Sequence, residues 1–184
     1  MPGPVEILMH EHRIIERALR ALRGVCQRLA SGASVPADVP LQLVGFFQTF
    51  ADRCHHGKEE KHLFPTLEAH GVPREGGPIG VMLDEHELGR GLVREMAEAA
   101  SAYGRGESDA ASRFVSAAER YMDLLAQHIY KEDNVLFRIA ENVLEAPTKA
   151  ALTEAFEREE AALGLGTHEH YEALASELEK TWAT

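Results

Sequence analysis

The residues of this chain that could do chemistry recur as a pattern in two copies. Each copy has a Glu-His pair, then a His-x-x-x-Glu motif roughly forty residues later, which leads into Leu-Phe. The potential metal-binding residues of this pattern are His12, His56, Glu60, His86, His128 and Glu132. Because imidazole nitrogens and carboxylate oxygens are common metal ligands, the repeat predicts a metal site built from two related halves.

Glycine and proline residues divide the chain into helical segments. Four long helices are expected over about 5–30, 40–70, 79–103 and 109–145, and two shorter ones over about 148–163 and 167–182. In the long segments, apolar residues recur at alternating steps of three and four, as in helices that bury one face. The predicted fold class is therefore all-α: an up-down-up-down four-helix bundle over 1–145, with a C-terminal helical extension over 146–184 packed on it.

The six residues of the pattern all lie on helix faces that should point into the bundle. Burying carboxylates there costs several kcal/mol unless an opposite charge compensates. Residues four apart share one helix face, so His56 with Glu60 can present a nitrogen and an oxygen to one centre, as can His128 with Glu132. Buried His-Glu ion pairs or an incidental richness in surface histidine are the alternatives. Four helices that each contribute an inward histidine favour a metal.

Other polar residues near these faces are weaker candidates. Glu16 follows the first histidine by four residues and is a candidate seventh ligand; the alternative is an ion pair on the helix flank. Asp133 lies one step off the inward face and is less favoured than its neighbour Glu132. His55 and Glu59 are offset by one residue and are expected to face solvent or a helix flank.

The ligand types also restrict the metal. Mixed nitrogen and oxygen ligands fit iron or manganese better than a closed structural zinc site, which prefers tetrahedral, sulfur-rich coordination. Six or seven ligands exceed what one ion needs, so we expect two iron ions bridged by Glu60 and Glu132, with manganese and zinc as alternatives. Four histidines for two ions leave coordination positions open. A small ligand such as dioxygen, nitric oxide or peroxide could bind there.

The bulk composition narrows the class of partner. The chain has 184 residues and a formal net charge of −11, and its basic residues are scattered among acids, so no nucleic-acid partner is expected. No export signal and no membrane-spanning apolar run are recognisable, which favours a cytoplasmic setting and no membrane partner. Cys26 and Cys54 are expected to be small core residues. His168 and His170, in the last helix, are expected to be structural.

On these motifs, roughly residues 5–145 resemble the hemerythrin-like, or HHE cation-binding, family. The resemblance implies a four-helix bundle that holds a non-haem di-iron centre at the six positions given above. Oxygen-carrying hemerythrins have a second histidine four residues after the one on the third helix, and here that position is Arg90. They also carry their last carboxylate five residues beyond its histidine, where this chain has Asp133. The missing imidazole argues against reversible oxygen transport and leaves a shell that Glu16, Asp133 or His170 could complete.

Two functions are weighed on this basis. The first is a di-iron protein that binds or senses a small ligand, namely dioxygen, nitric oxide or peroxide, or iron itself. The alternative is a di-iron oxidoreductase that reacts with peroxide or oxygen. Repair of iron–sulfur clusters is discounted, because the cluster-repair relatives carry an additional cysteine-bearing N-terminal segment. A helical scaffold for an unidentified protein partner would leave the inward histidines and carboxylates unexplained.

Overall fold

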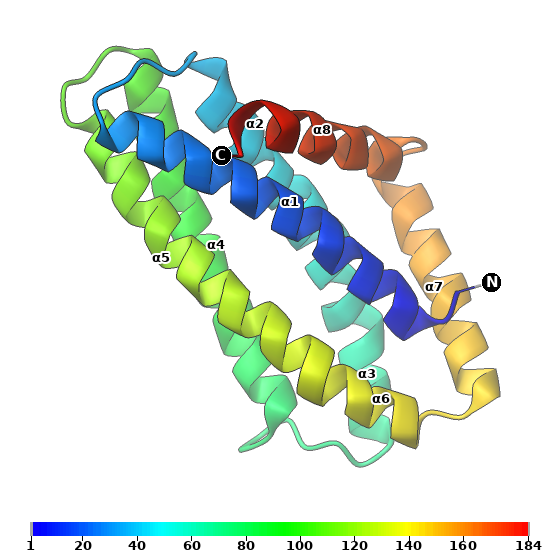
Figure 1. Ribbon diagram of the computed structural model, residues 1–184. Coiled ribbons are helices and arrows are strands. Elements are labelled where there is room, and N and C mark those ends of the chain that lie inside the picture. The colour runs from blue at the N-terminus through cyan, green and yellow to red at the C-terminus, as the bar shows by residue number, and fades with distance from the viewer. Residues whose placement is uncertain (1, 184) are drawn as a thin grey trace.

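The structure is a computed structural model that describes residues 2–183 and forms a bundle of antiparallel helices (Figure 1). No strand occurs among these residues. Helix α1 (Pro4–Ala30) runs in one direction, and the stretch from α2 (Asp38–Phe46) to α3 (Phe64–Ala69) returns. Helices α4 (Pro78–Gly104) and α5 (Ala110–Lys131) repeat the two directions. The predicted all-α, up-down-up-down four-helix bundle is confirmed.

Helix α1 begins and ends at residues suited to those positions. Pro4 occupies the first helical position, where its missing N–H would have had no partner within the helix. The backbone N–H of Gly3 donates a hydrogen bond to the side chain of Glu6 at 2.8 Å, which satisfies a donor at the helix start. After the last turn, Gly32 adopts a φ of +77°, a left-handed conformation that favours glycine and ends the helix.

The second and fourth rods of the bundle are not regular α-helices. The second contains the π-helical segments η1 (Phe47–His56) and η2 (Glu59–Leu63). The fourth continues from α5 through η3 (Glu132–Leu136), also π-helical, into α6 (Phe137–Val143). A π-helical turn takes in one more residue than an α-helical turn, so it changes which side chains share a face, and such turns are frequent at functional sites. Both short π-helical segments begin at a glutamate.

Two apolar clusters fill the bundle, and a polar layer separates them. The larger cluster includes Ile15, Phe47, Met96 and Tyr121, and the smaller includes Leu8, Leu63, Met82 and Leu136. On α1, Glu11 and His12 fall between Leu8 of the smaller cluster and Ile14 of the larger, and both are fully buried. Histidines and carboxylates therefore occupy the interior of the bundle, where apolar side chains would be the usual choice.

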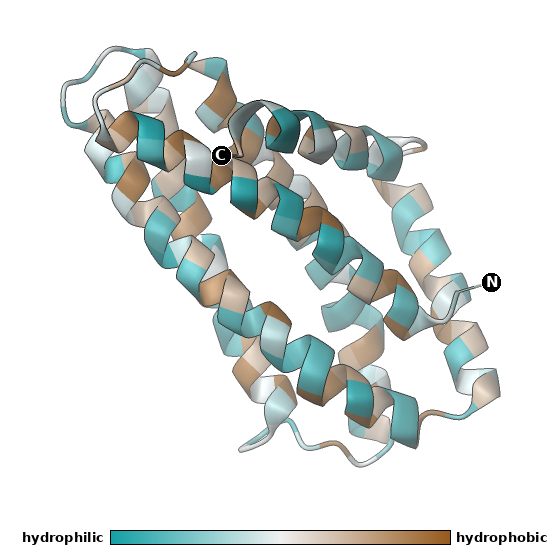
Figure 2. Ribbon diagram, in the orientation of Figure 1, coloured by the Kyte–Doolittle hydropathy of each residue, from teal (hydrophilic) through white to brown (hydrophobic). Residues whose placement is uncertain are grey.

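Helices α7 (Ala146–Leu163) and α8 (Thr167–Trp182) pack on one side of the bundle, and α8 lies alongside α1 (Figure 1). Gly24 permits this close approach, because a Cβ atom there would lie 1.7 Å from the backbone oxygen of Trp182. Along each helix, hydrophilic and hydrophobic residues are interspersed (Figure 2). Over residues 2–183, none of the helices combines the length and hydropathy that a membrane crossing needs.

Candidate metal centre

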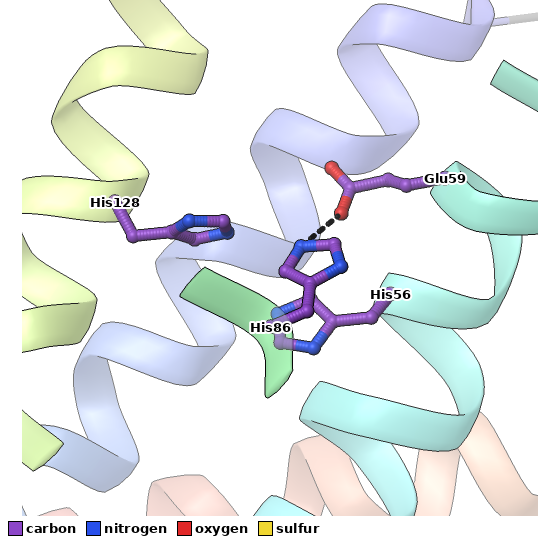
Figure 3. Close-up of side chains that lie close together, drawn as sticks. All are labelled: His56, Glu59, His86 and His128. Atoms are coloured by element: carbon purple, nitrogen blue, oxygen red, sulfur yellow. Dashed lines mark ion pairs between the residues drawn. The ribbon is translucent and has the colours of Figure 1, made fainter. Parts of the chain in front are cut away.

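Two groups of buried histidines and carboxylates meet between the apolar clusters. The three-histidine group consists of His56, Glu59, His86 and His128 (Figure 3), and the two-histidine group of His12, His55, Glu59 and Glu132. Within each group, one nitrogen or oxygen atom from every residue lies within 4.8 Å of the others. Because Glu59 belongs to both groups, its carboxylate is placed to link two cations.

All four rods of the bundle supply these residues. His12 lies on α1, His55 and His56 at the end of η1, Glu59 at the start of η2, His86 on α4, His128 on α5 and Glu132 at the start of η3. The rings of His56 and His86, both labelled in Figure 3, lie close together. They are stacked, and their centroids are 3.8 Å apart. Residues from segments far apart in sequence are thus held together by the packing of the bundle.

Many polar atoms of the two groups are buried without a hydrogen-bond partner. Among residues 2–183, these atoms are Nε2 of His55, His56, His86 and His128, Nδ1 of His56, both side-chain oxygens of Glu59, and Oε1 of Glu132. Glu59 lies 3.4 Å from Nε2 of His86, which is longer than a normal N–H···O hydrogen bond. Leaving this many polar atoms unsatisfied is costly, and a cation bound among them would satisfy them together. The donor set therefore fits metal ions.

Four of the five histidines are oriented by a second carboxylate outside the two groups. The contacts are His12 Nδ1 to Asp133 (2.6 Å), His55 Nδ1 to Glu11 (2.9 Å), His86 Nδ1 to Glu60 (2.6 Å) and His128 Nδ1 to Glu85 (2.9 Å). A hydrogen bond at Nδ1 fixes the tautomer and leaves the lone pair on Nε2. This carboxylate–histidine arrangement is typical of metal-binding imidazoles.

The structure changes the register of the first motif. Sequence spacing paired His56 with Glu60, but His55 and Glu59 are the pair that matches His128 and Glu132. The expectation that His55 and Glu59 face outward is wrong, since their relative exposures are 1% and 0%. The physical reason is the π-helical backbone of η1 and η2, which shifts the inward face by one residue.

Glu60, expected among the ligands, lies outside both groups. Its carboxylate accepts hydrogen bonds from Nδ1 of His86 and, at 2.8 Å, from Arg90. A sequence signal for the correct register was present in the Leu-Phe pairs. Leu136 follows His128 by eight residues, and counting back eight from Leu63 leads to His55.

His56 is the histidine that has no counterpart in the second copy, where Ile129 stands at the equivalent position. It joins the group that contains His86, where Arg90 had predicted an open shell. Arg90 itself turns to Asp52, donating a hydrogen bond at 2.9 Å, and also contacts two glutamates. The second rod thus adds an imidazole to the group in which the third rod contributes His86 alone.

None of the three residues expected to complete that shell belongs to either group. Glu16 lies 3.4 Å from Arg13 on the outside of α1, which matches the flank ion pair. Asp133 holds Nδ1 of His12 and also pairs with Arg13. His170 is exposed on α8. The two groups instead gain His55 and Glu59, which stand directly before His56 and Glu60 in the sequence.

A third polar cluster joins the C-terminal helices to this site. Glu11, which holds His55, also pairs with the fully buried Lys58, and Lys58 pairs in turn with Glu160 of α7. His168 of α8 lies 3.6 Å from Glu11. Burial alone would raise the pKa of Glu11. The contacts with His168 and His55 and the charge of Lys58 outweigh burial and hold this pKa well below its ordinary value.

In the two groups, too, burial competes with hydrogen bonds and neighbouring charges to set the pKa values of the side chains. Burial alone would lower the pKa of His12, but hydrogen bonds with Asp133 and Glu132 raise it to about 10. Without a cation, a proton on His12 thus compensates the buried carboxylates. Burial, followed by the charges of the neighbouring imidazoles, lowers the pKa of His56 well below its ordinary value. His56 is therefore neutral, the state in which an imidazole binds a metal.

A cavity of about 240 Å³ adjoins the three-histidine group. His56, His86 and His128 form part of its lining, together with Gly89 and Tyr121. A Cβ atom on Gly89 would make only ordinary contacts, the nearest at 3.7 Å from Tyr121 and a leucine. The cavity gives a small molecule a route to the three imidazoles.

Comparison with known proteins agrees with this geometry. The model of the hemerythrin HHE cation binding domain matches residues 3–140. The iron-sulfur cluster repair protein DnrN of Neisseria gonorrhoeae is 30% identical over 137 residues, which cover 71% of this chain and 85% of that protein. Uncharacterized proteins of Mycobacterium tuberculosis and Mycobacterium bovis are 27% identical over 155 residues, 84% of this chain.

The chain spans 60% of the length of these mycobacterial relatives. No solved structure matches. Since the family match extends over three quarters of the chain and includes every residue of the two groups, the chain belongs to the hemerythrin HHE cation-binding domain family.

Proposed function

We propose that the chain binds two iron ions, one in each histidine group, and that this pair binds dioxygen, nitric oxide or peroxide. The observation that carries the proposal is the set of buried, unpartnered nitrogen and oxygen atoms in the two groups. Five imidazoles and two carboxylates, of which Glu59 belongs to both groups, suit iron, because iron accepts mixed nitrogen and oxygen ligands. Bound iron would supply an open coordination position and the capacity to change oxidation state.

The residues around the two groups orient the imidazoles and determine which group is accessible to a small ligand. Glu11, Glu60, Glu85 and Asp133 orient the imidazoles through Nδ1. The two-histidine group is covered by Phe137, whose ring stacks on His12 with centroids 5.4 Å apart. Of the residues in the two groups, only His56, His86 and His128 line the cavity, and all three belong to the three-histidine group. We therefore expect the small ligand to enter from the side of His56, His86 and His128.

Metal analysis combined with absorption spectroscopy tests this proposal. The purified protein should hold two iron ions per chain, and its spectrum should change on exposure to nitric oxide, dioxygen or peroxide. His56→Ala removes a ligand from one group only and should lower the iron content while the other group retains its ion. A wild-type protein that binds no iron, or a variant with unchanged stoichiometry and spectrum, would contradict the assignment.

A di-iron oxidoreductase acting on peroxide or oxygen is the second candidate. The cavity volume of about 240 Å³ favours this candidate. A single water-sized molecule needs only roughly 10–15 Å³, so the cavity has room for a molecule larger than a diatomic ligand. Rapid peroxide consumption by the iron-loaded protein would support the enzyme, whereas a stable adduct would support a binding or sensing role.

Repair of iron–sulfur clusters is a third candidate because of the similarity to the Neisseria protein, 85% of which is covered. Restoration of activity to an oxidatively damaged iron–sulfur enzyme, dependent on the iron in this chain, would favour that role. If the iron-loaded protein restores no activity to the damaged enzyme and keeps its own iron, the repair role would be ruled out.

A further inference from the structure

The cavity beside the three-histidine group is lined by buried imidazoles, buried apolar side chains and exposed arginines. The three imidazoles in its lining are buried, as are the apolar side chains of Phe47, Val93 and Leu125. Arg53 and Arg94 also line the cavity, and both are exposed to solvent. A molecule that fills the cavity would therefore meet apolar walls along its length and guanidinium groups near the solvent.

In the part of the chain that the structure describes, the side chains of the two exposed arginines have no partner. Over residues 2–183, neither Arg53 nor Arg94 makes an ion pair or a hydrogen bond through its side chain. The third arginine of the lining, Arg90, is by contrast bound to Asp52 and two glutamates. The lining also holds the acidic Asp52 and Glu85, so its three arginines and two carboxylates give it a formal charge of +1 in a chain whose net charge is −11.

We propose that this cavity binds a small organic anion, with a carboxylate at Arg53 and Arg94 and an apolar body directed toward the imidazoles. Guanidinium groups recognise carboxylates through paired hydrogen bonds, and the apolar walls favour a hydrocarbon body over a fully hydrated anion. The inference rests on the proposed function: with iron in the three-histidine group, the apolar body of the anion would lie beside that iron. It assigns a substrate or co-ligand class to a site otherwise expected to hold only diatomic molecules or peroxide.

Benzoate and its neutral analogue benzamide are suitable probes, because they share a ring and differ in charge. Calorimetric titration should show tighter binding of benzoate to the wild-type protein, whose metal content is measured in the same sample. Arg53→Gln combined with Arg94→Gln should weaken benzoate binding by about tenfold and leave benzamide unaffected, since two charge-assisted contacts are lost. Arg138→Gln is the matched control, because Arg138 is also exposed and unpaired among the described residues but does not line the cavity.

Two substitutions at Gly89 test whether benzoate binds in the cavity. Gly89→Leu places a side chain in the cavity, and Gly89→Ala adds a Cβ atom that makes only ordinary contacts. The leucine variant should abolish benzoate binding, and the alanine variant should retain it. Gly89→Leu with wild-type affinity would overturn the proposal, because benzoate would then bind elsewhere.

The outcomes separate this inference from the proposed function. Equal affinity for benzoate and benzamide, or benzoate binding that depends on the metal but is unchanged in the arginine double variant, would overturn the anion site and leave the iron site standing. A protein without iron that still binds benzoate through the arginines would overturn the proposed function and support the anion site.

Discussion

The carboxylate of Glu11 accepts a hydrogen bond from Nδ1 of His55 at 2.9 Å, and both side chains are closed off from solvent. Glu85 makes the same contact with His128, also at 2.9 Å. Each glutamate pairs in addition with a lysine three residues after its histidine. The two halves of the site therefore repeat the same contacts at different depths, because α7 and α8 cover the first half and leave the second at the surface.

This difference in depth predicts unequal effects of the same substitution. Glu11→Ala leaves the ammonium of Lys58 buried with only Glu160 as partner, and should cost the metal-free protein about 3–5 kcal/mol of unfolding free energy. Glu85→Ala should cost clearly less, because Lys131 is 37% exposed and can turn to water. Urea unfolding of both variants measures the difference, and equal losses would show that burial does not set the cost.

Much of the fold could be predicted from the sequence. His12 and His86 lie on regular α-helices, so a period of 3.6 residues placed them correctly on the inward face. The up-down-up-down order followed from long helices joined by short loops. These features depend on local sequence and on burial, which the apolar pattern reports directly.

The register of the second rod could not be predicted in the same way. Whether a helix takes a π-helical turn depends on its packing and on the groups it must direct inward, and an α-helical period applied to the first motif selected Glu60 instead of Glu59. In the fourth rod the same period placed His128 and Glu132 on the inward face, where both are buried, because η3 begins only at Glu132, after four residues of α-helix that include His128. The ion pair between Lys58 and Glu160 of α7 arises from tertiary packing, so no periodic pattern in the sequence predicts it.

The approach of α8 to α1 predicts opposite effects of two glycine substitutions. Gly24→Ala would force the backbone at Trp182 to move and should cost about 1–3 kcal/mol. Gly91→Ala, on α4, meets only the tip of the Arg94 side chain at 3.8 Å and should stabilise the protein by about 0.5–1 kcal/mol through helix propensity. Thermal unfolding measures both. Because Trp182 is the single tryptophan, its fluorescence should shift in the first variant alone.

Burial of the two cysteines predicts low reactivity. Burial raises the pKa of Cys26 and of Cys54 to about 12, from the ordinary value of 9. At pH 8 the thiolate fraction of each should therefore be about a thousandfold smaller than in the unfolded chain. A thiol reagent should react with neither cysteine in the folded protein and with both in urea. Fast reaction of the folded protein would show that these side chains are accessible.

The same raised pKa values make stability depend on pH. Between about pH 9 and 12 the unfolded chain loses thiol protons that the folded chain keeps, so unfolding releases protons and rising pH favours it. The stabilising contribution is complete below pH 9 and is lost as the pH rises toward 12. A Cys26→Ala, Cys54→Ala double variant should lose stability less steeply over this range, as measured by urea unfolding at each pH.

The corrected register leads to a direct comparison of two neighbouring glutamates. Glu59 lies in both histidine groups, so Glu59→Gln should remove most of the bound metal, because glutamine carries no charge to hold two cations. Glu60→Gln should keep the metal but weaken its binding by about 10–100-fold, because Glu60 only orients His86. Metal content after dialysis against a graded series of chelator concentrations distinguishes the two variants. If Glu60→Gln lost the metal and Glu59→Gln retained it, the α-helical register would be correct and the shared role of Glu59 would be wrong.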